Sequence, residues 1–255
     1  MCKSNTGILL LALVFAVRPI QAQTNTNLYE VWAQAGTLIY QGDLTSNPLG
    51  NFRQLQPAWS VGISRQIHTN YALRAMITKG SLAANEALEK SPQWRQYRGL
   101  SFNNHLTSIA LNVVYTPGGT NPYFNASRWK PYFSGGIAMT HQRVTRQWNA
   151  INYSYISPRD PGVVGLGTDT THTPVTWQCS LPISVGVRYQ LSERMALNAE
   201  LMYHIGFTDY TDGFSYAGNP KRNDNFYGIH TGMVVNLGKN RYACPSFRST
   251  KYRKQ

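Results

Sequence analysis

The stretch MALNAELMYHIGF, residues 195–207, decides the fold class. Its odd positions are apolar throughout, whereas its even positions include the polar residues Asn198, Glu200 and His204. Successive side chains of a β-strand point to opposite faces, so this period of two predicts a strand with one apolar and one polar face.

The same alternation precedes this stretch in VTWQCSLPISVGVRY, residues 175–189, and the short segment QLSER joins the two as a hairpin. Applied to the whole chain, the pattern predicts eight strands. Their approximate ranges are 29–42, 56–68, 70–82, 103–116, 130–143, 174–189, 195–208 and 224–237.

The predicted strands have about ten or more residues, which suits tilted strands that cross a membrane. Long connections at 43–55, 83–102, 144–173 and 209–223 alternate with short ones; the link 117–129 is longer than its position predicts. We therefore expect an all-β, eight-stranded antiparallel transmembrane outer-membrane β-barrel. Its short turns and both termini are expected in the periplasm, and its long loops outside the cell.

Aromatic residues on the apolar faces support this prediction, because they fall near the predicted strand ends, where membrane barrels carry aromatic girdles. They are Trp59, Tyr71, Tyr115, Phe133, Trp177, Tyr189, Phe207 and Tyr227. The alternative is a soluble lipocalin-like barrel or sandwich with its apolar face inward. The Gly, Ser, Asn and Gln of the other face suit a packed polar lumen better than a solvated exterior.

The ends of the chain have different compositions from the barrel. Residues 1–22 carry Lys3, an apolar run and a cleavage site after Ala22, as in a cleaved signal peptide; the barrel takes 23–238 and a basic periplasmic tail 239–255. The net charge of +13 falls to +11 without Lys3 and Arg18. In an exported protein this charge favours outer-membrane lipids or an acidic protein surface over nucleic acid.

An eight-stranded barrel has room inside only for side chains. The inward positions include two acids and two arginines, Glu30, Arg74, Arg188 and Glu200, and we expect these charges to form a plug of ion pairs. The alternative is a proton or ion path. The other inward polar residues are Gln34, Asn112 and His230.

Enzymatic activity has little support, because the sequence lacks the serine-hydrolase, zinc-protease and nucleotide-binding motifs. Ser180 and His204 face inward near Asp209, so a lipid-modifying enzyme stays as an alternative, although such residues usually serve packing. The histidines lack metal-ligand spacing. We expect no enzyme, no cofactor and no small-molecule substrate.

Three stretches of the sequence go beyond barrel alternation. They are YEVWAQAGTLIYQGDL (29–44), KPYFSGGIAM (130–139) and YQLSERMALNAELMYHIGFTDYTDGFS (189–215), of which YQGDL and FTDYTDGFS are the most specific. They resemble the PorG-like outer-membrane barrels of the Bacteroidota type IX secretion system. The sequence departs from the family pattern at Gly213 and in the long 144–173 loop. Asp209 and Asp212 in the last stretch are expected to cap turns.

The resemblance implies a non-enzymatic barrel that ties a periplasmic ring, made by a lipoprotein and its partner, to the outer membrane during protein export. The alternative is a structural or adhesin barrel of the outer-membrane protein A type, acting through its outer loops. An anchor needs partner contacts on the periplasmic side, whereas an adhesin needs them in the loops.

Two periplasmic segments are candidates for partner contacts. The link 117–129 carries Tyr123, Phe124, Arg128 and Trp129, residue types common at binding hot spots, although girdle aromatics in a turn explain them equally well. The tail carries Arg241, Pro245, Phe247 and Arg248 around Cys244.

Cys244 and Cys179 are expected at opposite ends of the barrel, too far apart for a disulfide. An intermolecular disulfide of Cys244 with a periplasmic partner is therefore predicted; an inert thiol is the alternative.

Overall fold

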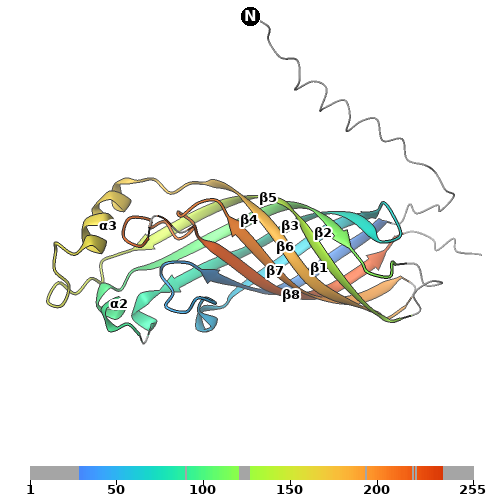
Figure 1. Ribbon diagram of the computed structural model, residues 1–255, viewed down its shortest axis with the longest axis horizontal. Coiled ribbons are helices and arrows are strands. Elements are labelled where there is room, and N and C mark those ends of the chain that lie inside the picture. The colour runs from blue at the N-terminus through green and yellow to red at the C-terminus, as the bar shows by residue number, and fades with distance from the viewer. Residues whose placement is uncertain are drawn as a thin grey trace, which may run out of the picture.

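The computed structural model describes residues 29–89, 91–120, 127–192, 194–219, 221 and 223–237. Its eight strands form one closed antiparallel barrel in which each strand pairs with its sequence neighbours and β8 closes onto β1 (Figure 1). The strands are β1 (Tyr29–Gln41), β2 (Gln56–Gln66), β3 (Tyr71–Asn85), β4 (Ser101–Tyr115), β5 (Trp129–Gln147), β6 (Trp177–Gln190), β7 (Met195–Gly206) and β8 (Asn225–Asn236). The predicted fold class is confirmed.

Three strands extend further than the alternation predicts. β3, β4 and β5 continue together until Asn85 pairs with Ser101 and Ser101 with Gln147. Outward side chains such as Ser81, Asn103 and Arg143 are polar there, so the hydrophobic pattern ends before the hydrogen bonding does.

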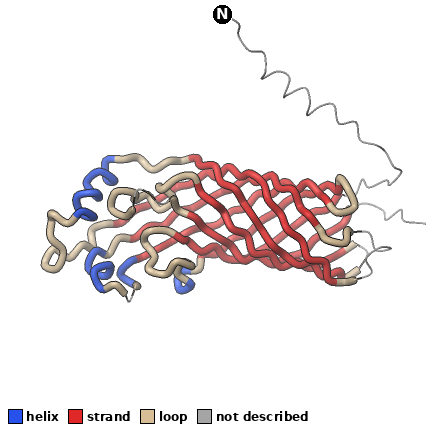
Figure 2. The backbone as a smooth tube through the Cα atoms, viewed as in Figure 1, coloured by secondary structure: helices blue, strands red, loops and turns tan. Residues whose placement is uncertain are grey.

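The two ends of the barrel differ. Short turns between β2 and β3 and between β6 and β7 lie at the end where β1 begins, here called the turn end. The connections that follow β1, β3, β5 and β7, with all labelled helices, gather at the opposite loop end (Figure 2). The loop-end helices are η1 (Phe52–Gln54), η2 (Glu86–Leu88), α2 (Gln93–Arg98) and α3 (Pro161–Thr171). In the described part of the chain, no helix has the length and hydropathy to cross a bilayer.

The helix α3 (Pro161–Thr171) lies in the 144–173 connection, which the sequence analysis predicts only as a long loop. Asp160 caps it by accepting a hydrogen bond of 2.9 Å from Gly162 N, and Pro161 occupies its first turn, where a missing N–H costs nothing. Three glycines and a weak apolar periodicity hide this helix from a sequence pattern.

The barrel is apolar outside and polar inside. Outward side chains such as Ile109, Ile137 and Ile183 are 56%, 65% and 52% exposed, while inward polar residues such as Asn104, Asn112 and Thr140 are almost fully buried. A water-soluble barrel has the opposite arrangement, so this surface requires lipid around it. The chain is therefore an integral membrane barrel of the outer-membrane type.

The predicted girdle aromatics point outward, among them Tyr71 and Tyr115 at the turn end and Trp59 and Trp177 nearer the loop end. Along β3, the distance from Tyr71 to Lys79 is roughly 26 Å at ~3.3 Å per residue. At a strand tilt of ~40° this gives an apolar belt about 20 Å tall, comparable to the belts of outer-membrane barrels.

Candidate functional site in the lumen and at the loop end

The centre of the lumen is filled by an ion pair between β3 and β7. Arg74 donates two hydrogen bonds to Glu200, at 2.6 and 3.0 Å, and both side chains are fully buried. Glu200 also accepts hydrogen bonds from Gln34, Tyr132 and Ser184, at 3.0, 3.0 and 2.5 Å. The charges that strand parity directs inward thus partner each other, as the plug requires.

A second ion pair lies nearer the turn end. Arg188 donates to both carboxylate oxygens of Glu30, at 2.8 and 3.1 Å, and Ser64 donates to Glu30 at 3.0 Å. Trp32 stands between the two pairs, because the guanidinium carbons of Arg188 and Arg74 lie 4.7 and 4.8 Å from its ring centroid. The two ion pairs and one indole therefore form a continuous plug.

The two sequence stretches with the most specific family resemblance meet at the loop end. Tyr40 of YQGDL places its hydroxyl 2.7 Å from Asp212 of FTDYTDGFS and 2.6 Å from Asp224 in the same connection. Leu44 of the first stretch and Phe214 of the second belong to one buried apolar cluster. Residues about 170 positions apart in the chain thus form one closed cap over the lumen.

The hydrogen bonds of this cap require a proton on one carboxyl group. Tyr40 has one hydroxyl proton, so it donates to one of Asp212 and Asp224 and accepts from the other, which must be protonated. Burial raises the pKa of both carboxyl groups well above the usual range, and the nearby carboxylates of Asp43 and Asp209 add to the shift. The cap therefore holds a proton that exposed aspartates would release at neutral pH.

Backbone contacts complete the cap. Asp212 accepts a hydrogen bond of 2.8 Å from Phe214 N, which confirms that it caps a turn. Gly213, where the sequence departs from the family pattern, adopts φ +84°, and the side-chain atoms of Arg146 leave little room for a Cβ there, so glycine suits this position.

Asp209 does not cap a turn as predicted. Its carboxylate oxygens accept no backbone N–H in the described part of the chain. Burial raises the pKa of Asp209 to about 6, and the nearby Asp43 and Asp169 add to the shift, although the Ser215 hydroxyl opposes it. Asp169 performs the capping instead, because it accepts N–H bonds from the three residues 215–217, at 3.1, 3.1 and 2.8 Å.

A further ion-pair cluster at this end was missed by the sequence analysis. Glu86 is fully buried and binds Arg98 and Arg95, at 2.8 Å from Arg98 Nε and 3.3 Å from Arg95 Nη1. The Glu86 carboxylate thereby links α2, which carries both arginines, to the backbone N–H that precedes β4. No periodic pattern surrounds these residues, which lie 9 and 12 positions apart on two separate helices, so only their opposite charges could have suggested the pairing.

Ser180 and His204 lie beside each other, with Ser180 Oγ 3.3 Å from His204 Nδ1. The other ring nitrogen of His204 lies 3.2 Å from Met202 Sδ, and the ring stacks on Phe226. In a catalytic triad a carboxylate would orient this histidine. Here thioether and aromatic neighbours surround it, an environment typical of packing.

The predicted partner-binding residues are only partly described. Arg128 and Trp129 are exposed at the turn end, where Trp129 lies 4.6 Å from the Tyr189 ring, as expected of girdle aromatics. Cys179 points outward on β6. Tyr123, Phe124, Arg241, Cys244, Pro245, Phe247 and Arg248 lie outside the described residues, as do the predicted signal peptide, 1–22, and the predicted tail, 239–255. Within the described ranges, no cluster of His, Cys, Asp and Glu could hold a metal ion.

Three comparisons with known proteins were made, against family models, curated proteins and solved structures. No family model and no curated protein matches the sequence. Solved structures with a similar shape include OprG of Pseudomonas aeruginosa, with a TM-score of 0.47 and 10% identity over 84% of this chain and 97% of that one. Neisserial surface protein A has a TM-score of 0.46 and 14% identity, covering 81% and 96%. Ail of Yersinia pestis has a TM-score of 0.43 and 7% identity over 83% of this chain and 99% of that one. Likeness at this level says nothing about function.

Proposed function

We propose that this chain is a non-enzymatic outer-membrane barrel of a type IX secretion machine, where it anchors the periplasmic ring to the outer membrane during protein export. The observation that carries the proposal is the contact of Tyr40 with Asp212 and Asp224. It unites YQGDL and FTDYTDGFS, the two stretches with the most specific resemblance to PorG-like barrels, in one buried unit. The two stretches therefore belong together because their side chains are in contact, and the alternation common to all membrane barrels does not account for this contact.

The filled lumen favours an anchor over a channel. The pairs Arg74–Glu200 and Arg188–Glu30 occupy the interior, and the cap closes the loop end. A barrel without an open path contributes to export through its surfaces and its attachment to the membrane.

The proposed orientation puts the turn end in the periplasm, as in other outer-membrane barrels. The first and last described residues lie together at that end, where Leu237 N donates to Tyr29 O at 2.8 Å. In this orientation both termini lie in the periplasm, and the tail with Cys244 is available to the ring lipoprotein and its partner. The proposed partners include outer-membrane lipids, but neither nucleic acid nor a small-molecule substrate.

A cross-linking pull-down from intact cells tests the proposal. The tagged full-length chain should recover the ring lipoprotein and its partner, and deletion of residues 241–255 should reduce this recovery several-fold. The control variant Tyr153→Ala/Tyr155→Ala changes two loop-end side chains that are 59% and 68% exposed, and should leave the recovery unchanged. Absence of ring proteins from the wild-type sample would refute the proposal.

The alternative is a structural or adhesin barrel that acts through its loops. Large apolar side chains at the loop end favour it, since Leu49, Tyr155 and Val164 are 63%, 68% and 61% exposed. In that case the Tyr153/Tyr155 variant, rather than the tail deletion, would lose the partner.

A further inference from the structure

The outward face of the barrel has an uneven charge distribution. The eight strands contain only two acidic residues, Glu30 and Glu200, and both point into the lumen. The outward positions of the strands carry three full charges, all basic: Arg65 near the turn end, and Lys79 and Arg143 toward the loop end. A membrane-facing surface with cations and no anions suits anionic ligands.

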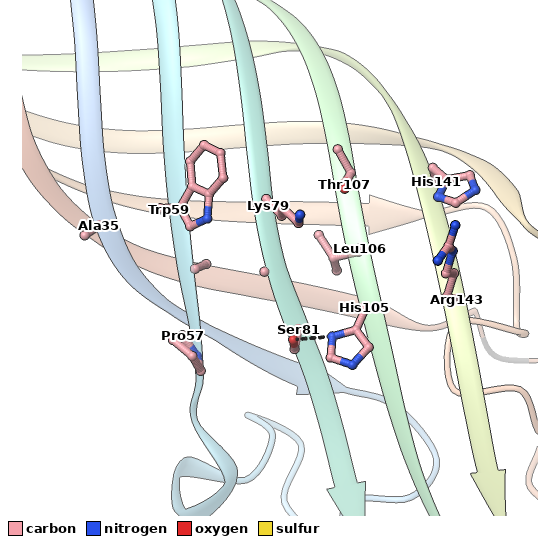
Figure 3. Close-up of a pocket in the computed structure, with 12 residues that line it drawn as sticks. Ala35, Pro57, Trp59, Lys79, Ser81, His105, Leu106, Thr107, His141 and Arg143 are labelled. Carbon is pink, nitrogen blue, oxygen red and sulfur yellow. Dashed lines mark hydrogen bonds between the residues drawn. The ribbon is translucent and has the colours of Figure 1, made fainter.

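Lys79 and Arg143 belong to one group of side chains on β3, β4 and β5. In the strand register, Lys79 lies beside Thr107, and Thr107 beside His141; in the next outward row toward the loops, Ser81 lies beside His105, and His105 beside Arg143. Figure 3 shows these side chains together on one face, with Ser81 Oγ 2.9 Å from His105 Nδ1. They line a groove of about 840 Å³, and Trp59 borders it. We call this group the basic groove.

The cations of the basic groove lack anionic partners within the protein. Among the described residues, the salt bridges involve Arg74, Arg95, Arg98 and Arg188, and neither Lys79 nor Arg143 takes part in one. Both side chains are exposed. Cations that face a membrane are costly without a counter-charge, and a lipid phosphate supplies one.

An apolar groove adjoins the basic groove on its turn-end side. The next two outward rows are Ile77, Ile109, Met139 and Cys179, and then Ala75, Leu111, Ile137 and Leu181. Most of these residues line a groove of about 400 Å³ whose surface is almost entirely apolar. The outward side chain of Ala75 is small and leaves room between the larger ones. The apolar lining of this groove has the chemistry to hold acyl chains.

We propose that the basic groove and the apolar groove together bind a phosphorylated glycolipid of the outer leaflet, with its phosphate groups on Lys79 and Arg143 and its acyl chains on the apolar rows. Arg forms bidentate hydrogen bonds with phosphate and Lys contributes a point charge, while Ser81, His105 and His141 add further donors. A free phosphate would use only the basic groove. The choice of leaflet rests on the orientation proposed above.

Native mass spectrometry of the full-length chain in neutral detergent tests this site. The probes are bisphosphorylated lipid A, enzymatically dephosphorylated lipid A, phosphatidylglycerol and inorganic phosphate. We expect one bisphosphorylated lipid A to stay bound, and the double variant Lys79→Gln/Arg143→Gln to weaken this binding roughly tenfold or more, since each basic residue near a membrane surface contributes measurably to anionic lipid binding.

Two matched variants make the result specific. Arg65→Gln removes an outward cation at the other end of β2 and should leave binding unchanged, whereas Lys79→Arg/Arg143→Lys should retain most of it. Heat-modifiable gel migration checks that every variant is folded.

The site would be refuted by equal lipid A binding in the double variant, by equal binding of dephosphorylated lipid A, or by a preference for phosphatidylglycerol. Displacement of the lipid by millimolar inorganic phosphate would equally refute it, because it would reveal an anion site without a lipid role. The assay contains no ring proteins, so its outcome is independent of the pull-down.

Discussion

Replacement of Glu200 by alanine should destabilise the barrel strongly without opening a conducting path. Glu200 accepts five hydrogen bonds, two of them from Arg74, and both side chains are completely buried. The substitution leaves the Arg74 guanidinium buried and without its counter-ion. Removal of one partner from a buried pair typically costs about 3–5 kcal/mol.

Two companion variants separate the charge from the packing. Glu200→Gln keeps the shape and some of the hydrogen bonds, so it should cost about 1.5–3 kcal/mol, the range for hydrogen bonds to charged groups. The double variant Arg74→Met/Glu200→Leu removes both charges and should be far milder than Glu200→Ala, because no unpaired ion remains.

Urea unfolding in lipid vesicles, followed by gel migration and by Trp fluorescence, measures these free energies. Trp32 is a suitable reporter because Arg74 lies 4.8 Å from its ring centroid. Planar-bilayer conductance measured on the same variants tests the alternative of an ion path. A Glu200→Ala barrel within about 1 kcal/mol of wild type, or one that conducts while remaining fully stable, would refute the plug.

The remaining predictions concern the loop end and the tail. Because the folded pKa values of Asp212 and Asp224 are raised above the unfolded value of about 4, their contribution to stability is fully present below that value and declines as the pH rises through the folded pKa. Asp212→Asn should therefore flatten the pH dependence of loop protection against limited proteolysis; an unchanged profile would contradict the shared proton. Asp209, with its pKa raised to about 6, should contribute a loss of stability between about pH 4 and pH 6, and Asp209→Asn should remove it in urea titrations. Asp169→Ala leaves three backbone N–H groups unpaired and should cost the loop end about 1–3 kcal/mol, visible as faster amide hydrogen exchange at residues 215–217 but not in the strands. A covalent contact through Cys244 predicts a higher-mass band on non-reducing gels that is absent from Cys244→Ser, and a wild-type sample without this band would leave the thiol inert.

The barrel can be predicted from the sequence because the alternation of apolar and polar residues that produces it is present within each strand separately. In MALNAELMYHIGF the alternation of apolar and polar residues assigns each side chain to the lipid face or the lumen face. Glu200 can therefore be placed in the lumen without knowledge of any other strand. The pairing of Arg74 with Glu200 is harder to predict, because it depends on how strands far apart in the chain cross the barrel. The four inward charges named from the sequence, Glu30, Arg74, Arg188 and Glu200, predict only that partners exist.

The cap and the basic groove depend on contacts that no local pattern records. Tyr40 lies near the end of β1 and Asp212 in the connection before β8, and neither residue by itself indicates that the two are in contact. Lys79 and Arg143 interrupt the apolar alternation near the ends of their strands. In the sequence alone, each looks like an ordinary departure from the pattern rather than part of a binding site. Only the register of β3, β4 and β5 brings them into one groove.

The contact of Tyr40 with Asp212 and Asp224 also constrains the order in which the protein assembles. Tyr40 emerges early in synthesis, on the first strand, whereas both aspartates belong to the connection before the last strand. The loop between these partners spans nearly the whole barrel, and its closure entropy must be overcome before the hydrogen bonds can form. Tyr40 therefore stays without these partners until β8 reaches β1, and the completed contact marks a barrel whose seam has closed.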